Sequence, residues 1–188
     1  MKLITKIVLL ISFFIFKFSY AQENPDAAIL KILLTKYYAE EKVIVKNRLQ
    51  LLSFYCNKAP NNEETLELIS KNELLKKNTA ALKSQINPAI NEDWSKEFNI
   101  LFTNQHQFLK SKVNNCLSLD EFQKAAEQFK ENNQRLMIVS KPMYFANNFC
   151  LVKVAFYRNI EHNSGSFFLF EKNNGIWTVK EILNQWST

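Results

Sequence analysis

The sequence predicts an α+β fold, in which an N-terminal helical layer packs on a C-terminal antiparallel β-meander of about four or five strands. Apolar residues recur at helical spacing from Asp26 to about Asn132, and their spacing becomes strand-like from about Arg135 onward. Without its first 21 residues the chain of 188 has 167 residues, a length that suits one compact domain. We therefore expect a single domain with a helical part over residues 22–133 and a β-meander over residues 134–188.

The first 21 residues are typical of an export signal. They combine a positive start at Lys2 and Lys6, an apolar run at Ile7–Phe16, and small residues at Ser19 and Ala21. The run is shorter than the roughly 20 residues that a membrane-spanning helix needs. We predict cleavage between Ala21 and Gln22 and export of residues 22–188 to a bacterial periplasm or out of the cell, without a remaining transmembrane segment. An uncleaved anchor is the alternative, because large aromatic residues stand near the cut.

The first helix of the mature chain is expected to begin after Pro25 and to continue to about Tyr55. Its stripe of apolar residues has spacings of three, four or seven and consists of Leu30, Leu34, Tyr37, Ile44, Leu51 and Tyr55. Glu41 and Arg48 interrupt the stripe, so we interpret it as a core helix of a globular domain rather than a coiled coil. A loop is expected next, at Asn57-Lys58-Ala59-Pro60-Asn61.

The sequence predicts further helices in the remainder of the first part. One should begin near Asn62 and continue to about Ile86. Asn87-Pro88 indicates a restart, since asparagine caps helices and proline suits their first turn. The segment Ser118-Leu119-Asp120-Glu121 has the pattern of a capping box, in which serine and glutamate satisfy each other's backbone amides.

The strands of the meander are expected at Leu136–Val139, Met143–Phe145, Phe149–Tyr157, Ser166–Lys172 and Ile176–Leu183. Asn174-Gly175 favours a two-residue hairpin turn between the last two strands. That turn would place Phe168 opposite Glu181 and segregate Phe168, Phe170, Trp177, Val179 and Leu183 on one face, away from Ile182. A turn with a bulge would shift the pairing and mix the faces differently.

The strand Phe149–Tyr157 is apolar on both faces except at Lys153, which is typical of a central strand. Helices cover one face in the predicted fold, and the other face also needs a cover. A helix on each side of the sheet would provide it. The alternatives are a protein partner, a second copy of the chain bound through the sheet, or a ligand.

Composition excludes several classes of function. The chain has 24 basic and 18 acidic side chains, but the export signal contributes three of the basic ones and none of the acidic ones. Lysine and glutamate alternate along the helical stretches instead of forming a basic stripe, so we expect no nucleic-acid partner. Two glycines in the whole chain argue against a glycine-built phosphate loop, and we predict no cofactor.

The chain has three cysteines, so at most one pair can bond within it. Cys56 and Cys116 both follow the ends of helical patterns, and this is the pair we favour for a disulfide. Cys150 lies in an apolar strand, where a free thiol behaves as a small hydrophobe. The alternative, that none of them pairs, stays open.

Few residues are candidates for chemistry. His106 and His162 lack ligand partners at metal-binding spacing, apart from Glu161 beside His162, so His162 is only a weak metal candidate. Glu181 is predicted on the apolar face of the last hairpin, where burial would raise the pKa of its carboxyl and suit it to acid or base catalysis. Alternatively, Glu181 lies near a sheet end and reaches water.

The C-terminal residues resemble two groups of proteins. The run S-K-P-M-Y-F-A-N-N-F-C-L-V, followed by S-F-F-L-F-E-K-N-N-G-I-W-T-V-K, resembles the tail of small exported bacterial proteins of unknown function. Helices followed by a meander with a Gly-x-Trp hairpin are similar to the nuclear-transport-factor-two-like superfamily, which implies a curved, cone-like sheet around a pocket. The helical part is longer here than in that fold, and an acid–histidine pair is missing where its enzymes carry one.

These features together predict an exported, non-catalytic binding or interaction module of the bacterial cell envelope. The aromatic-rich sheet without a catalytic constellation is the observation behind this prediction. The alternative is a small-ligand-binding or hydrolytic pocket protein centred on Glu181 and the meander.

Overall fold

The structure is a computed structural model that describes residues 24–38, 44–45, 48–49, 52–87, 90–102, 109–110, 113, 116–128, 135–159 and 161–188. The predicted export signal with its cleavage site at Ala21 and Gln22 lies outside these residues, as does His106. The α+β class is confirmed, with helices in the N-terminal half packed against a C-terminal antiparallel sheet. None of the helices in the described part of the chain has the length and apolar content that crossing a bilayer requires.

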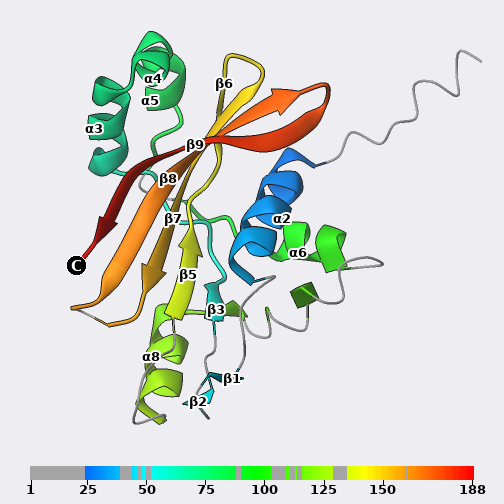
Figure 1. The fold of residues 1–188 in the computed structure, drawn as a ribbon, viewed down its shortest axis with the longest axis vertical. Helices are drawn as coiled ribbons and strands as arrows, with labels where there is room; N and C mark the ends of the chain where they lie inside the picture. Colours follow the sequence, from blue (N-terminus) through cyan, green and yellow to red (C-terminus); the bar gives the residue numbers. More distant parts are fainter. Residues whose placement is uncertain are drawn as a thin grey trace, which may run out of the picture.

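One large sheet forms the centre of the molecule (Figure 1). Its strand order is β4-β3-β5-β7-β8-β9, and β6 pairs with one side of β7. The antiparallel strands are β5 (Arg135–Val139), β6 (Met143–Phe145), β7 (Phe149–Tyr157), β8 (Asn163–Asn173) and β9 (Ile176–Ser187). The predicted meander is therefore present, and its last two strands extend beyond their predicted ends.

The N-terminal half also contributes strands, which the sequence did not predict. The first helix, α2 (Pro25–Tyr38), ends well before the predicted Tyr55. β3 (Leu52–Tyr55) runs parallel to β5, and β4 (Cys116–Leu117) runs parallel to β3, so the whole sheet is mixed. The short strands β1 (Ile44–Val45) and β2 (Arg48–Leu49) pair only with each other. The prediction was wrong because the pairing of β3 with β5 is long-range and leaves no local periodic signal.

The second predicted helix is divided into three short ones, α3 (Glu63–Lys71), α4 (Glu73–Lys77) and α5 (Thr79–Lys83). Asn72 causes the first break, because its side chain accepts hydrogen bonds from the backbone amides of Leu74 and Leu75 and caps a new helix. α6 (Ser95–Phe102) begins after the predicted restart. The capping box before α8 (Leu119–Gln128) is confirmed, with reciprocal hydrogen bonds between Ser118 and Glu121.

Helices cover both faces of the sheet at β7 (Figure 1). Cys150, Val152 and Val154 of β7 belong to a core that includes residues of α2 and α6. Leu151, on the opposite face, belongs to a second core that includes residues of α3, α4 and α5. The apolar second face of β7 therefore has a cover within the chain itself, which is the first of the arrangements considered above.

The β8–β9 hairpin has the predicted turn but a different register further along. Asn174 and Gly175 have φ values of 52° and 85°, as a two-residue primed turn requires. Phe170 pairs with Val179 but Leu169 pairs with Glu181, so Lys180 is an extra residue in β9. This bulge moves Ile182 to the face of Phe168 and Leu183 to the opposite face, which is the reverse of the prediction.

Candidate functional site

Polar and charged residues line an open pocket of about 730 Å³. Three segments enclose it: the start of α2, the loop after β3, and the first turn of α6 with the residues before it. Its lining consists of Asn24, Pro25, Asp26, Lys58, Glu92, Asp93, Lys96 and Glu97. We call this hollow the polar pocket.

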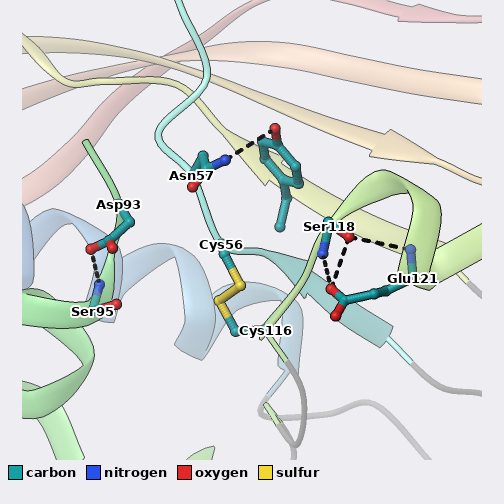
Figure 2. Close-up of a disulfide and its surroundings, with 8 residues drawn as sticks. Cys56, Asn57, Asp93, Ser95, Cys116, Ser118 and Glu121 are labelled. Carbon is teal, nitrogen blue, oxygen red and sulfur yellow. Dashed lines mark hydrogen bonds between the residues drawn. A yellow bond between two sulfur atoms is a disulfide. The ribbon is translucent and has the colours of Figure 1, made fainter. Parts of the chain in front are cut away.

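Backbone hydrogen bonds fix the loop that carries Lys58. The Lys58 amide donates to the Glu92 carbonyl at 2.9 Å, and the Trp94 amide donates to the Cys56 carbonyl at 3.0 Å. On the other side, the Ala59 amide donates to the Val139 carbonyl of β5 at 3.0 Å. Figure 2 shows the loop beginning at the disulfide, with Asn57 and Asp93 on neighbouring segments. The position of Lys58 is thus set by the sheet and by the segment before α6.

Lys58 lies at the floor of the polar pocket and is only 5% exposed. Its ammonium is 2.6 Å from Asp26 Oδ2, 3.3 Å from Glu97 Oε1 and 3.7 Å from Glu92 Oε2. It also lies 4.8 Å from the ring centroid of Trp94, which provides a cation–π contact. Burial alone would lower the pKa of Lys58, but the hydrogen bonds and charges of Asp26 and Glu97 outweigh this effect and raise it.

Asp26 connects Lys58 to a second set of buried groups. The Tyr144 hydroxyl donates to Asp26 Oδ1 at 2.7 Å, so both carboxylate oxygens of Asp26 have donors. Burial raises the pKa of Tyr144 far above its usual range, with further contributions from the neighbouring Cys150 and Asp26. Burial likewise raises the pKa of the Cys150 thiol well above its usual range, and the charge of Asp26 adds to the effect. Both groups stay protonated at neutral pH.

The floor of the polar pocket has an uncompensated negative charge. Asp26 and Glu97 share the single cation Lys58, and Glu97 is only 4% exposed. Glu97 Oε2 is buried and has no hydrogen-bond partner among the described residues. A buried acceptor without a donor carries a desolvation cost of about 1–3 kcal/mol, more for a charged group. A positive charge placed in the pocket would be attracted by the excess negative charge of Asp26 and Glu97.

The rim of the polar pocket is held by its own partners. Glu92 forms an ion pair with Lys141, and the hydrogen bond from Lys141 is the largest of the effects that lower the pKa of Glu92. Asp93 Oδ1 accepts from the Ser95 amide at 2.9 Å at the start of α6 (Figure 2). The rim therefore keeps its shape without a ligand.

The buried protonated groups predict a loss of stability at alkaline pH. The unfolded chain releases the Cys150 and Tyr144 protons around their ordinary pKa values of 9.0 and 10.0, and the Lys58 proton around 10.5, whereas the folded chain holds each of the three to a higher pH. The free energy of unfolding should be constant up to pH 9 and then fall, by up to about 1.4 kcal/mol per pH unit for each group. Urea unfolding between pH 7 and pH 11 measures this profile.

A matched variant tests whether Cys150 causes the first decline in the free energy of unfolding. Cys150→Ala should shift the start of the decline from about pH 9 to about pH 10, because Tyr144 then titrates first in the unfolded chain. An unfolding free energy that stays constant from pH 7 to pH 11 would contradict the assignment.

The structure places the predicted site residues away from the polar pocket. Glu181 is exposed in β9, opposite Leu169, instead of lying on an apolar face. His162 is exposed, and its Nδ1 lies 3.0 Å from Asn159 Oδ1. Within the described ranges, histidine, cysteine, aspartate and glutamate nowhere form a group of three that could hold a metal ion. Neither Glu181 nor His162 therefore belongs to a metal-binding group within the part of the chain that the structure describes.

The cysteines have the predicted arrangement in the structure. A disulfide joins Cys56, directly after β3, to Cys116 at the start of β4, with their Cα atoms 4.9 Å apart (Figure 2). Cys150 is free and buried in β7. The disulfide lies two positions before Lys58 and therefore helps to anchor the loop that forms the floor of the polar pocket.

Sequence reasoning missed Asp26, Lys58 and Glu97. Each stands in a segment that is ordinary by itself: a helix start, a polar loop and a charged first turn. The pairing of the loop after β3 with the segment before α6 brings Lys58 to Glu97, and the packing of α2 beside α6 adds Asp26. The one signal in the sequence is the short polar loop after Cys56, which contains a single cation.

Comparison with known proteins finds no matching protein-family model, no matching curated protein sequence and no matching solved structure. The chemistry of the polar pocket is therefore the basis on which a function can be argued.

Proposed function

We propose that this protein is an exported, non-catalytic binding module of the bacterial cell envelope whose polar pocket binds a small organic cation, such as an amine or a guanidinium compound. The observation that carries the proposal is the buried Glu97 carboxylate at the pocket floor, one oxygen of which has no donor among the described residues. Export is supported by the N-terminal signal pattern in the sequence.

The charge at the pocket floor favours a cationic ligand over an anionic one. The only buried cation of the lining, Lys58, is already in contact with Asp26 and Glu97 and has Glu92 within 4 Å. An anion entering the pocket would compete with these carboxylates for Lys58 and would be repelled by them. A cation would instead be attracted by the excess negative charge, through protein of low effective dielectric constant.

The donor and acceptor pattern favours an organic cation over a bare metal ion. Both oxygens of Asp26 already accept hydrogen bonds, and Asp93 Oδ1 caps α6. These oxygens are engaged by hydrogen-bond donors and are poorly placed to replace the hydration shell of a metal ion. The volume of about 730 Å³ is in the range of sites for small organic molecules.

The catalytic alternative centred on Glu181 has little support. Glu181 is exposed and lies outside the lining of the polar pocket. A binding role agrees better with a site whose charged groups are held in fixed ion pairs.

A ligand pair of opposite charge tests the proposal. Butylammonium should raise the thermal unfolding temperature of the mature protein, whereas butyrate of the same chain length should not, because only the cation offsets the charge of Glu97. Glu97→Gln should weaken butylammonium binding about tenfold, since one buried unit charge is lost. Glu67→Gln is the matched control, because Glu67 is exposed in a separate ion pair with Lys71.

Two outcomes would refute the proposed ligand class. One is equal or greater stabilisation by butyrate. The other is butylammonium binding that is the same in the wild-type protein, in Glu97→Gln and in Glu67→Gln.

A further inference from the structure

A second hollow lies between α2 and the tip of the β8–β9 hairpin, and we call it the apolar groove. It has a volume of about 440 Å³ and is lined by Ala28, Lys31, Ile32, Thr35, Lys36, Ile176 and Trp177. The hairpin tip projects beyond the rest of the sheet on the side of α2 (Figure 1). Ile176 is 68% exposed, which is high for a large apolar side chain.

The groove exists because α2 is apolar around most of its circumference. Buried residues of α2 occur at positions 27–30, 33, 34 and 38, so they are not confined to one stripe. A helix of this kind is usually covered on every side. Here Ala28, Ile32 and Thr35 occupy one further face at helical spacing, and the hairpin tip covers it only in part.

Two lysines line the apolar groove and a third stands beside it, and none of the three forms an ion pair with another described residue. Lys31 and Lys36 stand on the α2 side, and Lys172 stands on the hairpin side, where its ammonium is 5.6 Å from the Trp177 ring centroid. Lys36 has a similar contact at 6.0 Å with the ring of Phe168. In the described part of the chain, no carboxylate forms an ion pair with any of the three.

We propose that the apolar groove docks an acidic segment of a partner protein, in which an apolar side chain inserts between Ile32 and Trp177 while carboxylates reach the lysines. The apolar lining supplies the anchor, and the lysines on the α2 side and the hairpin side, which have no ion pair within the described part of the chain, supply the charge complementarity. This inference is independent of the cation site, which lies at the other hollow and has the opposite charge preference.

The distribution of charge distinguishes this occupant from others. A lipid with one carboxylate would neutralise a single lysine. The lysines lie on the α2 side and on the hairpin side of the groove, which favours a ligand with several negative charges. The N-terminal segment of this chain has Lys2, Lys6 and Lys17 and is repelled by a basic rim. An acidic peptide with apolar side chains can pack against the apolar lining and form ion pairs with the lysines around it.

The test uses the mature protein and a short fluorescein-labelled peptide in which glutamate and leucine alternate. Fluorescence anisotropy should show micromolar binding that weakens as salt is added, because the lysine contacts are screened. Ile176→Asp should weaken binding about tenfold or more, since it removes an apolar contact and adds repulsion. The double variant Lys31→Glu with Lys36→Glu should weaken it at least as much. Ile100→Asp is the matched control, because Ile100 is 48% exposed on α6, outside the groove.

Each other result would overturn the proposal. A peptide that alternates lysine and leucine could bind as tightly as the acidic one. The acidic peptide could also bind the Ile176→Asp variant as tightly as it binds the Ile100→Asp variant. In a competition experiment, decanoate could displace the labelled peptide although an excess of the same peptide without label does not. That result would assign the groove to a lipid. Sedimentation could show a dimer that Ile176→Asp dissociates, which would assign the groove to a second copy. Glu97→Gln should leave peptide binding unchanged, so that failure here is separate from failure of the cation site.

Discussion

Replacing Lys58 with methionine is expected to lower the free energy of unfolding at pH 7 by about 3–5 kcal/mol. Methionine has a similar length and apolar stem but no charge. The variant would leave Asp26 and Glu97 close to one another in the interior without the cation they share. Removing one partner of a buried ion pair is costly because the remaining charge cannot be rehydrated. Urea unfolding followed by circular dichroism measures the difference.

A matched comparison makes the Lys58 result specific. Lys71→Met removes an exposed ion pair with Glu67 and should cost less than about 1 kcal/mol. If Lys58→Met is no less stable than Lys71→Met, the buried charge cluster does not exist as described.

Removing the disulfide by the double substitution Cys56→Ala and Cys116→Ala is the second change with a large expected effect. The two cysteines are separated by 60 positions in the sequence. Closing a loop of that length reduces the entropy of the unfolded chain, which predicts a loss of about 4 kcal/mol on the loop-closure model. The loop contains α3, α4, α5 and α6, so the helices on both faces of the sheet depend on it.

The disulfide prediction has its own control within the chain. Cys150→Ala leaves the disulfide intact and should cost much less, about 1 kcal/mol, because only a small buried group is removed. Unfolding of the oxidised and the reduced wild-type protein should reproduce the difference between the wild type and the double variant. Equal stability of the oxidised and the reduced protein would show that the 56–116 bond does not constrain the fold.

The second half of the fold was predictable because its signals are local. Asn174-Gly175 favours a hairpin turn with two positive φ values, and the apolar run Phe149–Tyr157, interrupted only by Lys153, marks a central strand. The capping box at Ser118 and Glu121 likewise involves residues three positions apart. The turn type, the spacing of apolar residues and helix capping each depend on a few neighbouring residues. They can therefore be predicted directly from the sequence.

The features that were missed depend on long-range pairing. The sequence predicts a helix where β3 lies, because the partners β4 and β5 are far along the chain. Pairing with them does not change the spacing of apolar residues within β3 itself. The bulge at Lys180, which places Glu181 in solvent, follows from how β9 packs against β8 as a whole. The polar pocket was missed for the same reason, because Asp26, Lys58 and Glu97 meet only after the loops have paired.

The most direct test of the proposed cation site is an NMR titration of isotope-labelled residues 22–188 with butylammonium and, separately, with butyrate. Butylammonium should shift the backbone resonances of residues 24–26, 58 and 92–97, and butyrate should leave them unchanged. Shifts concentrated elsewhere, or the same shifts with both ligands, would contradict the claim that the charge at Glu97 selects a cation.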